Sequence, residues 1–330
     1  MIQQKNIFNS LKEFEKSNLN EHSALSLQLN YNSLQDQDAQ ILSNAIKNCV
    51  NLISLTLCLN YNNIQDQGLT NLGQAFLFCK NLQYLSLFMN SNLFGEEGIS
   101  GLGQGLVNCK NLMSFTLMIG SNRIGQQGAQ NLGNILSQCK SIKNLTLNLQ
   151  ANKICNEGAN GIAKGLSKCH SLQSVTLNLL ANNIIGIGAS IICTSLQNCT
   201  QLSTLFLDFQ LNGISDQGTA ELGNALQKFQ NLQTLTLNLG ANKIGNEGVI
   251  SVVQDLSTCK AILSLVLALY KTQITNEAMT KLASSLASFQ KLYNLSIKLE
   301  TNDISQREKQ LFSRKIQKLK RIVKKFVQFD

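Results

Sequence analysis

Residues 232–261, LQTLTLNLGANKIGNEGVISVVQDLSTCKA, contain the pattern that decides the fold. Leu235, Leu237 and Leu239 alternate with polar residues, which predicts a β-strand with one buried face. After the glycine of this pattern, apolar residues recur about four and eight positions later in most copies, as at Leu102 and Leu106, which predicts one face of a helix. The stretch therefore predicts a strand, a loop, a helix and a second loop.

This unit recurs every 30 residues without insertion or deletion, giving ten in-phase copies. A fixed position after each predicted strand is an asparagine in every copy except one, where it is Thr272. These marker asparagines are Asn32, Asn62, Asn92, Asn122, Asn152, Asn182, Asn212, Asn242 and Asn302. We expect these asparagines to form a ladder that satisfies buried backbone groups, and Thr272 to weaken it. An Asp or Asn before most helices is expected to cap the helix that it precedes: Asp36, Asp66, Asn156, Asp216, Asn246 and Asn276.

The consensus LxxLxLxLxxNxIxxxGxxxLxxxLxxC resembles the leucine-rich-repeat family, in particular its ribonuclease-inhibitor-like class, over roughly residues 22–320. Its strand part is two residues longer than the usual LxLxxN, a form similar to a repeat common among ciliate proteins. The resemblance implies an α/β solenoid shaped as a horseshoe. A parallel sheet would line its concave face and helices its convex face.

Three segments are expected. Residues 1–21 form an N-terminal helical cap in which Ile7, Leu11 and Phe14 share one face. Residues 22–304 form the solenoid, and residues 305–330 form a basic amphipathic helix that completes the last repeat. The apolar stripe predicted for that helix comprises Phe312, Ile316, Leu319, Val323 and Phe326.

Charge is concentrated in this last segment. It contains nine basic residues against Glu308 and Asp330, so it contributes +7 of the net +9. The candidate binding residues on it are Arg314, Lys315, Lys318, Arg321, Lys324 and Lys325. Three interpretations stay open: the helix is only a cap, it binds an acidic protein surface, RNA or anionic lipid, or it binds calmodulin through Ile316, Val323 and Phe329.

The outward positions of the predicted strands are mostly small and polar, with few charges, which argues against nucleic acid binding on the concave face. The candidate partner-binding residues there are Cys58, Phe88, Met118, Phe206 and Asp208. Cys58, Phe88 and Met118 lie in register on consecutive repeats and predict an exposed apolar contact site. The alternative is that these three residues have no binding role and are neutral substitutions on a crowded sheet.

The chain offers little for catalysis, so no catalytic, cofactor or metal site is predicted. Seven of its ten cysteines occupy the same position of the repeat: Cys49, Cys79, Cys109, Cys139, Cys169, Cys199 and Cys259. Other repeats have Phe or Leu at this position, which indicates that it is buried and apolar and that the thiols are free. The two histidines, His22 and His170, are far apart in phase, and His22 is expected to have a capping role. The glycines between Gly101 and Gly105 are interpreted as helix-packing residues and not as a phosphate loop.

These features predict a non-enzymatic scaffold that binds protein partners. Reduced cysteines and the lack of a signal sequence or of a long apolar run predict a cytoplasmic protein without a membrane span, with nuclear, cytoskeletal or ciliary association left open. The alternative that the resemblance implies is a Ran-type GTPase-activating protein, with Arg123 as the only arginine of the solenoid segment, residues 22–304. That family typically has an acidic C-terminal tail, whereas this tail is basic.

Overall fold

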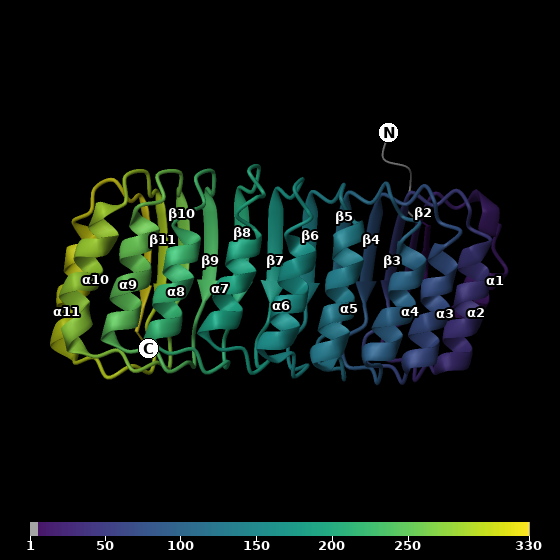
Figure 1. Ribbon diagram of the computed structural model, residues 1–330, viewed down its shortest axis with the longest axis horizontal. Coiled ribbons are helices and arrows are strands. Elements are labelled where there is room, and N and C mark those ends of the chain that lie inside the picture. The colour runs from purple at the N-terminus through teal and green to yellow at the C-terminus, as the bar shows by residue number, and fades with distance from the viewer. Residues whose placement is uncertain (1–5, 330) are drawn as a thin grey trace. The chain divides into compact units, whose positions relative to one another are not determined.

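The computed structural model describes residues 6–329 as two compact units, Met1–Leu172 (unit 1) and Gln173–Asp330 (unit 2). Within each unit, parallel strands alternate with helices along the chain, and the helices cover one face of the sheet (Figure 1). We call the other face of each sheet the open face. This is the α/β repeat architecture that the 30-residue period predicts.

Unit 1 contains six strands, six helices and one short 3-10 helix among the residues described. The strands are β1 (Asn6–Phe8), β2 (Ala24–Gln28), β3 (Ser54–Cys58), β4 (Tyr84–Phe88), β5 (Ser114–Met118) and β6 (Asn144–Asn148). The helices are α1 (Leu11–Glu15), η1 (Leu19–Glu21), α2 (Asp36–Lys47), α3 (Asp66–Phe76), α4 (Glu96–Leu106), α5 (Gly125–Gln138) and α6 (Cys155–Leu166).

Unit 2 contains six strands and five helices over residues 173–329. The strands are β7 (Ser174–Asn178), β8 (Thr204–Asp208), β9 (Thr234–Asn238), β10 (Ser264–Ala268), β11 (Asn294–Lys298) and β12 (Lys324–Gln328). The helices are α7 (Gly186–Ser195), α8 (Asp216–Leu226), α9 (Asn246–Ser257), α10 (Asn276–Ser288) and α11 (Gln306–Gln317).

Equivalent residues of neighbouring repeats pair across the sheet, so each side chain stacks on its counterpart. Leu55 of β3 pairs with Leu25 on one side and Leu85 on the other, and all three are buried. The alternate positions, such as Thr56, face away from the helices and are half-buried. The strict period thus places one continuous layer of leucines between sheet and helices within each unit.

The asparagine ladder is present as predicted. The backbone N–H groups of Asn122 and Ile124 donate to Oδ1 of Asn152 at 3.1 and 3.3 Å. Nδ2 of Asn152 donates to the carbonyl oxygens of Ile119 and Leu149 at 2.9 and 3.1 Å. Asn152 therefore joins its own turn to the turn of the preceding repeat, and Asn62, Asn212 and Asn242 do the same.

The acidic residues at the helix starts cap a different helix from the one expected. Asp66 is the first residue of α3, yet its Oδ1 accepts hydrogen bonds from the N–H groups of Gly95 and Gly98, at 2.6 and 2.8 Å, where α4 begins. Asn276 likewise accepts from the N–H of Ser305, before α11. The prediction that each residue caps its own helix was wrong, because at the first helical position the side chain points toward the neighbouring repeat.

The N-terminal segment is not the helical cap that was predicted. Asn6–Phe8 forms β1, which pairs with β2 in parallel, and the helix spans only Leu11–Glu15. Ile7 is exposed, whereas Phe14 is fully buried. The edge of β2 carries backbone groups that need partners, and a short strand satisfies them where a helix would not.

The prediction of one continuous C-terminal helix was also wrong. Helix α11 ends at Gln317, the chain turns at the buried Ile322, and Lys324–Gln328 forms β12 beside β11. Phe312 and Ile316 are buried as expected, but Val323 and Phe326 are exposed. The missed signal was Ile322, which lies 30 residues after Leu292 and therefore begins a further strand segment in phase.

Candidate functional site

The predicted apolar trio of unit 1 lies at the C-terminal ends of three consecutive strands. Cys58 of β3 pairs with Phe88 of β4, and Phe88 pairs with Met118 of β5. Phe88 and Met118 are half-buried on the open face. Cys58 is only 8% exposed, so it adds less accessible surface to this site than its outward strand position predicts.

A second asparagine ladder, which the sequence analysis missed, crosses this same edge. The N–H and Nδ2 groups of Asn60 both donate to Oδ1 of Asn30, and those of Asn90 donate to Oδ1 of Asn60, at 2.9–3.0 Å. The N–H of Gly120 then donates to Oδ1 of Asn90. These bonds fix the backbone two residues beyond Phe88 and Met118. The signal was an Asn two positions before the marker Asn in the first three copies.

Two tyrosines project from the turns next to this ladder. Tyr31 and Tyr61 stack with ring centroids 4.5 Å apart and planes 7° from parallel. They are 72% and 52% exposed. Both have left-handed backbone with φ near +60°, a conformation that is uncommon for a bulky residue. We call Tyr31, Tyr61, Phe88 and Met118 the aromatic edge of unit 1.

The predicted residues of unit 2, Phe206 and Asp208, lie on β8 and are half-buried on its open face. The carboxylate of Asp208 accepts from the N–H of Gln210 at 2.9 Å and from Nδ2 of Asn238 at 3.0 Å. Burial raises the pKa of Asp208, and these two hydrogen bonds oppose the rise. Asp208 is thus held by its own sheet. Phe206 shares its register position on this open face with Val266 of β10 and with the exposed Phe326 of β12.

The six predicted basic residues are spread over three structures and not over one helix. Arg314 and Lys315 lie on α11, Lys318 is its C-cap, Arg321 lies in the turn, and Lys324 and Lys325 lie on β12. The calmodulin interpretation loses its basis. Its three anchors, Ile316, Val323 and Phe329, fall on the helix, in the turn and just after the strand.

A buried histidine cluster holds the N-terminal segment and resembles a catalytic arrangement in distances only. Nε2 of His22 lies 2.8 Å from Oγ of Ser17, and Nδ1 lies 2.8 Å from Nδ2 of Asn6. The Ser17 hydroxyl donates its hydrogen to the carbonyl oxygen of Phe14 at 2.7 Å, so its oxygen accepts a hydrogen bond from Nε2–H of His22. In this arrangement His22 cannot act as a base toward Ser17. Desolvation lowers the pKa of His22. The cluster therefore supports the capping role predicted for this residue.

A leucine-rich-repeat family model matches residues 231–253, within the stretch whose pattern recurs through both units. The fold is that of leucine-rich-repeat proteins. An internalin, inlF, from Listeria monocytogenes is similar in structure with a TM-score of 0.51 at 20% identity, covering 92% of this chain and 72% of that chain. A chain of the yeast Rad7 and Elc1 complex gives a TM-score of 0.56 at 16% identity, covering 94% of this chain and 73% of that chain. A search of curated proteins finds no match to the sequence.

Within residues 6–329, no group of His, Cys, Asp and Glu side chains is arranged to hold a metal ion. Over the same residues, no helix combines the length and apolar character needed to cross a membrane. All ten cysteines are free, and the seven phased ones are buried, as their replacement by Phe and Leu predicts.

We expect Cys155 to react first when the native protein meets a thiol reagent, because it is the one cysteine of the described residues that is not buried. Cys58, which the sequence analysis places at an exposed contact site, is buried and should react more slowly. Burial raises the pKa of Cys109 to about 12 and of Cys139 to about 11, so both stay protonated near neutral pH. Burial of these two thiols in their neutral form contributes fully to stability below the thiol pKa of the unfolded chain, which is about 8.5. That contribution is lost as the pH rises through the pKa values that the thiols have in the folded protein.

Mass spectrometry of alkylated peptides over time checks this order. Labelling of Cys109 or Cys139 in the native protein as fast as Cys155 would contradict the buried slot. Their labelling should accelerate only with unfolding or at strongly alkaline pH.

Proposed function

We propose that this leucine-rich-repeat protein is a non-enzymatic scaffold whose open face in unit 1 binds a protein partner. The aromatic edge carries the proposal. It comprises Phe88 and Met118 at the C-terminal ends of β4 and β5, and the stacked Tyr31 and Tyr61 in the turns after β2 and β3. The second asparagine ladder links the turns of these repeats. Aromatic residues and methionine are enriched at the centres of protein interfaces, where they bury large areas on a rigid support.

The support beneath these side chains is preorganised. Tyr61 donates its backbone N–H to the carbonyl oxygen of Asn90 at 2.9 Å, and Tyr31 donates to that of Asn60 at 3.0 Å. Ordering costs of binding are therefore low at this edge, because the backbone does not rearrange. The yeast Rad7 and Elc1 structure is a complex of two proteins, which accords with a binding role for this fold.

We also propose a finer classification of the repeats. Helices α2 to α10 span between 10 and 14 residues, which supports the ribonuclease-inhibitor-like class with the long, ciliate-like strand segment. The buried free thiols support a reducing compartment, and we propose the cytoplasm, with nuclear or ciliary structures as sites of association. Fluorescence microscopy of the tagged chain in its source cells tests the location.

We expect the double variant Phe88→Ala with Met118→Ala to raise the dissociation rate of the partner at least about tenfold, because apolar anchors dominate truncation energies. The partner is first recovered by affinity capture, and its dissociation is then followed on immobilised protein. Salt dependence should be unchanged, since the anchors carry no charge.

The matched control is Phe78→Ala with Val107→Ala, which removes two exposed apolar side chains outside the open face of the same unit. Equal dissociation rates for the two double variants would overturn the proposed binding surface.

A Ran-type GTPase-activating role is the alternative that the resemblance implies. Arg123 is exposed in the turn before α5, where its backbone N–H donates to the carbonyl oxygen of Phe94. We expect no acceleration of GTP hydrolysis by Ran in a single-turnover assay. A rate increase that disappears in Arg123→Ala would replace the scaffold proposal by this one.

A further inference from the structure

Three exposed apolar side chains lie next to one another at the edge of the unit 2 sheet where β10, β11 and β12 begin. They are Leu263, Tyr293 and Val323, which are between 42% and 60% exposed. The backbone N–H of Tyr293 donates to the carbonyl oxygen of Leu263 at 2.8 Å, and that of Val323 donates to the carbonyl oxygen of Tyr293 at 2.9 Å. These bonds place the three residues in register on neighbouring strands, about 4.8 Å apart. We call them the apolar row.

The packing of the repeats does not require apolar residues at this position. In the preceding repeats of unit 2 the equivalent residues are Gln173, Ser203 and Gln233. Their side chains are also partly or fully exposed, so none of them belongs to the buried leucine layer. The last three repeats therefore present apolar surface to water where a polar residue would fit.

The loops that contain the apolar row are strongly basic. Residues 258–264, 288–294 and 318–324 contain six cations and no acidic residue, whereas the equivalent loops 198–204 and 228–234 contain only Lys228. The six cations are all exposed: Lys260, Lys291, Lys318, Lys320, Arg321 and Lys324. We call these six residues and the apolar row together the basic rim.

The carboxylates of the last three repeats do not neutralise the basic rim. Glu277 and Glu308 lie in the first turns of α10 and α11, at the far ends of these helices from the loops that follow them. Asp255 is nearer, but a side chain added at Gly223 would meet its Oδ2 at 2.8 Å, so this carboxylate is directed toward α8. Arg321 donates one hydrogen bond to the carbonyl oxygen of Ala287, which leaves further donors of its guanidinium for a ligand.

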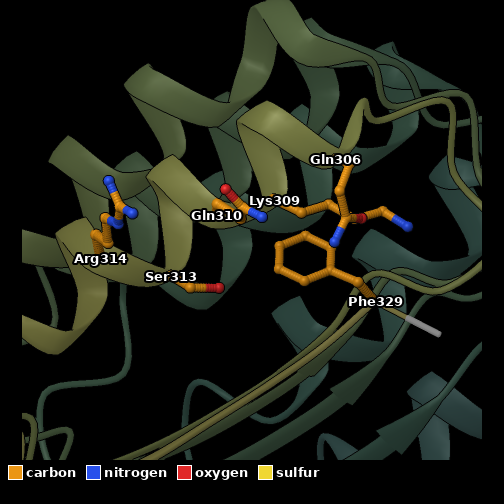
Figure 2. A pocket seen from close by; sticks show the side chains of 6 residues that line it. All are labelled: Gln306, Lys309, Gln310, Ser313, Arg314 and Phe329. Atoms are coloured by element: carbon orange, nitrogen blue, oxygen red, sulfur yellow. The ribbon is translucent and has the colours of Figure 1, made fainter.

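The last strand, which carries one end of the basic rim, is fixed at both of its ends. Ile322 is buried just before Val323. Beyond the other end, the ring of Phe329 packs edge-on against the buried Phe312 of α11 with centroids 6.0 Å apart, and it lies 5.8 Å from Nζ of Lys309 (Figure 2). The terminal part of the basic rim is therefore held in place on the sheet and needs little ordering on binding.

We infer that the basic rim docks unit 2 on a membrane surface that contains anionic phospholipids. Each lysine or arginine close to such a surface strengthens binding about fivefold. Apolar and aromatic side chains between the cations can enter the headgroup region, where tyrosine is a preferred residue. The basic rim presents both features along one edge of the sheet.

The composition of the basic rim favours a membrane over RNA or an acidic peptide. Five of its six cations are lysines, whose flexible point charges suit a mobile layer of headgroups and select no fixed arrangement of carboxylates. RNA would stack only on the aromatic ring of Tyr293 and would leave Leu263 and Val323 in water. The two aliphatic side chains gain most by leaving water for the apolar boundary of a bilayer.

The test is co-sedimentation of the full chain with phosphatidylcholine vesicles, with and without phosphatidylserine. We expect binding only to the vesicles with phosphatidylserine, and weaker binding as salt rises. Lys320→Gln with Lys324→Gln should weaken it about 25-fold, the product of two fivefold effects. The matched control, Lys243→Gln with Lys271→Gln, removes two exposed lysines from the turns after β9 and β10, at the opposite edge of the sheet. It should change binding by no more than about twofold.

A second pair of variants tests the apolar row. Leu263→Gln with Val323→Gln introduces a residue that two earlier repeats already have at this position, and it should weaken binding at least about tenfold. The matched control is Leu211→Gln with Leu311→Gln, which removes two exposed leucines of unit 2 outside the basic rim. It should bind the vesicles as the unchanged chain does.

Fluorescence reports insertion directly, because the chain contains no tryptophan. The emission of Tyr293→Trp should shift to shorter wavelength on vesicles with phosphatidylserine, as its ring leaves water. Leu211→Trp should show no shift. An aromatic side chain is compatible with that turn, since Tyr61 occupies the equivalent position in unit 1.

Three results would overturn the inference: no binding to the anionic vesicles, equal losses in the rim and control variants, or an unshifted emission of Tyr293→Trp on bound vesicles. Polyglutamate and single-stranded RNA form the remaining arms. If either binds with loss only in the rim variants while the vesicles do not bind, the basic rim serves that ligand and the membrane inference is wrong. Because all these variants leave the aromatic edge of unit 1 intact, failure here leaves the proposed scaffold function standing.

Discussion

Gly105→Ala should lower the free energy of unfolding by about 3 kcal/mol, although alanine is the better helix former by about 1 kcal/mol. A Cβ on Gly105 would overlap the backbone carbonyl of Gly73 in the neighbouring helix α3. Backbone atoms cannot rotate away as a side chain can, so α3 and α4 would have to separate. Urea denaturation followed by helical circular dichroism measures the loss.

The same helix provides the control. A Cβ on Gly103 would meet only the side chain of Ile135, at 2.7 Å from its Cγ1, which can change its rotamer. We expect Gly103→Ala to change stability by less than about 1 kcal/mol in either direction. Equal losses in the two variants would mean that this run of glycines is not a packing device.

Asn152→Ala should also cost about 3 kcal/mol, and Thr272→Ala about 1 kcal/mol. Removing the Asn152 side chain takes the acceptor from the backbone N–H groups of Asn122 and Ile124 and breaks its own hydrogen bonds to the carbonyl oxygens of Ile119 and Leu149. The Ile119 oxygen keeps the bond from Nδ2 of Asn122, so the cost comes mainly from the two N–H groups. Thr272 has a single hydroxyl hydrogen, shared between the carbonyl oxygen of Leu269 and Oδ1 of Asn302. Its removal therefore breaks fewer bonds.

Urea midpoints of the two variants decide this comparison, with the slope of the transition checked for constancy. Equal midpoints would show that Asn152 stabilises the folded protein no more than Thr272 does. A larger loss of stability in Thr272→Ala than in Asn152→Ala would mean that the threonine, and not the asparagine, makes the greater contribution at this position.

Much of the repeat was predictable because its signals are local and recur ten times. Alternating leucines such as Leu235 and Leu237 define a strand within a few residues, and the phase then fixes which of them are buried together. The buried cysteine slot was predictable for the same reason, since Phe229 and Phe289 occupy it in other copies.

The predictions that were wrong concern residues whose hydrogen-bond partners lie one repeat away. Asp66 has the same sequence context whether it caps its own helix or the next, and only the packing of α3 against α4 decides between them. Similarly, residues 305–330 have an amphipathic pattern that a helix would satisfy, but the edge of β11 offers backbone hydrogen bonds that make a strand of Lys324–Gln328.

The aromatic edge was only half predictable. Phe88 and Met118 follow from the strand phase, whereas the stacking of Tyr31 on Tyr61 depends on left-handed turns that place both rings side by side. Nothing in the local pattern indicates that a tyrosine there projects from the turn. A search of each phase for large residues in adjacent copies would have found the pair.

Site-specific photo-crosslinking at Phe88 tests the proposed binding surface most directly. Benzoylphenylalanine is placed at Phe88 or, as a control, at the exposed Phe78 outside the open face. We predict that the captured partner forms a covalent product on irradiation at position 88 and none at position 78. A product at position 78 with none at position 88 would contradict recognition through the open face of unit 1.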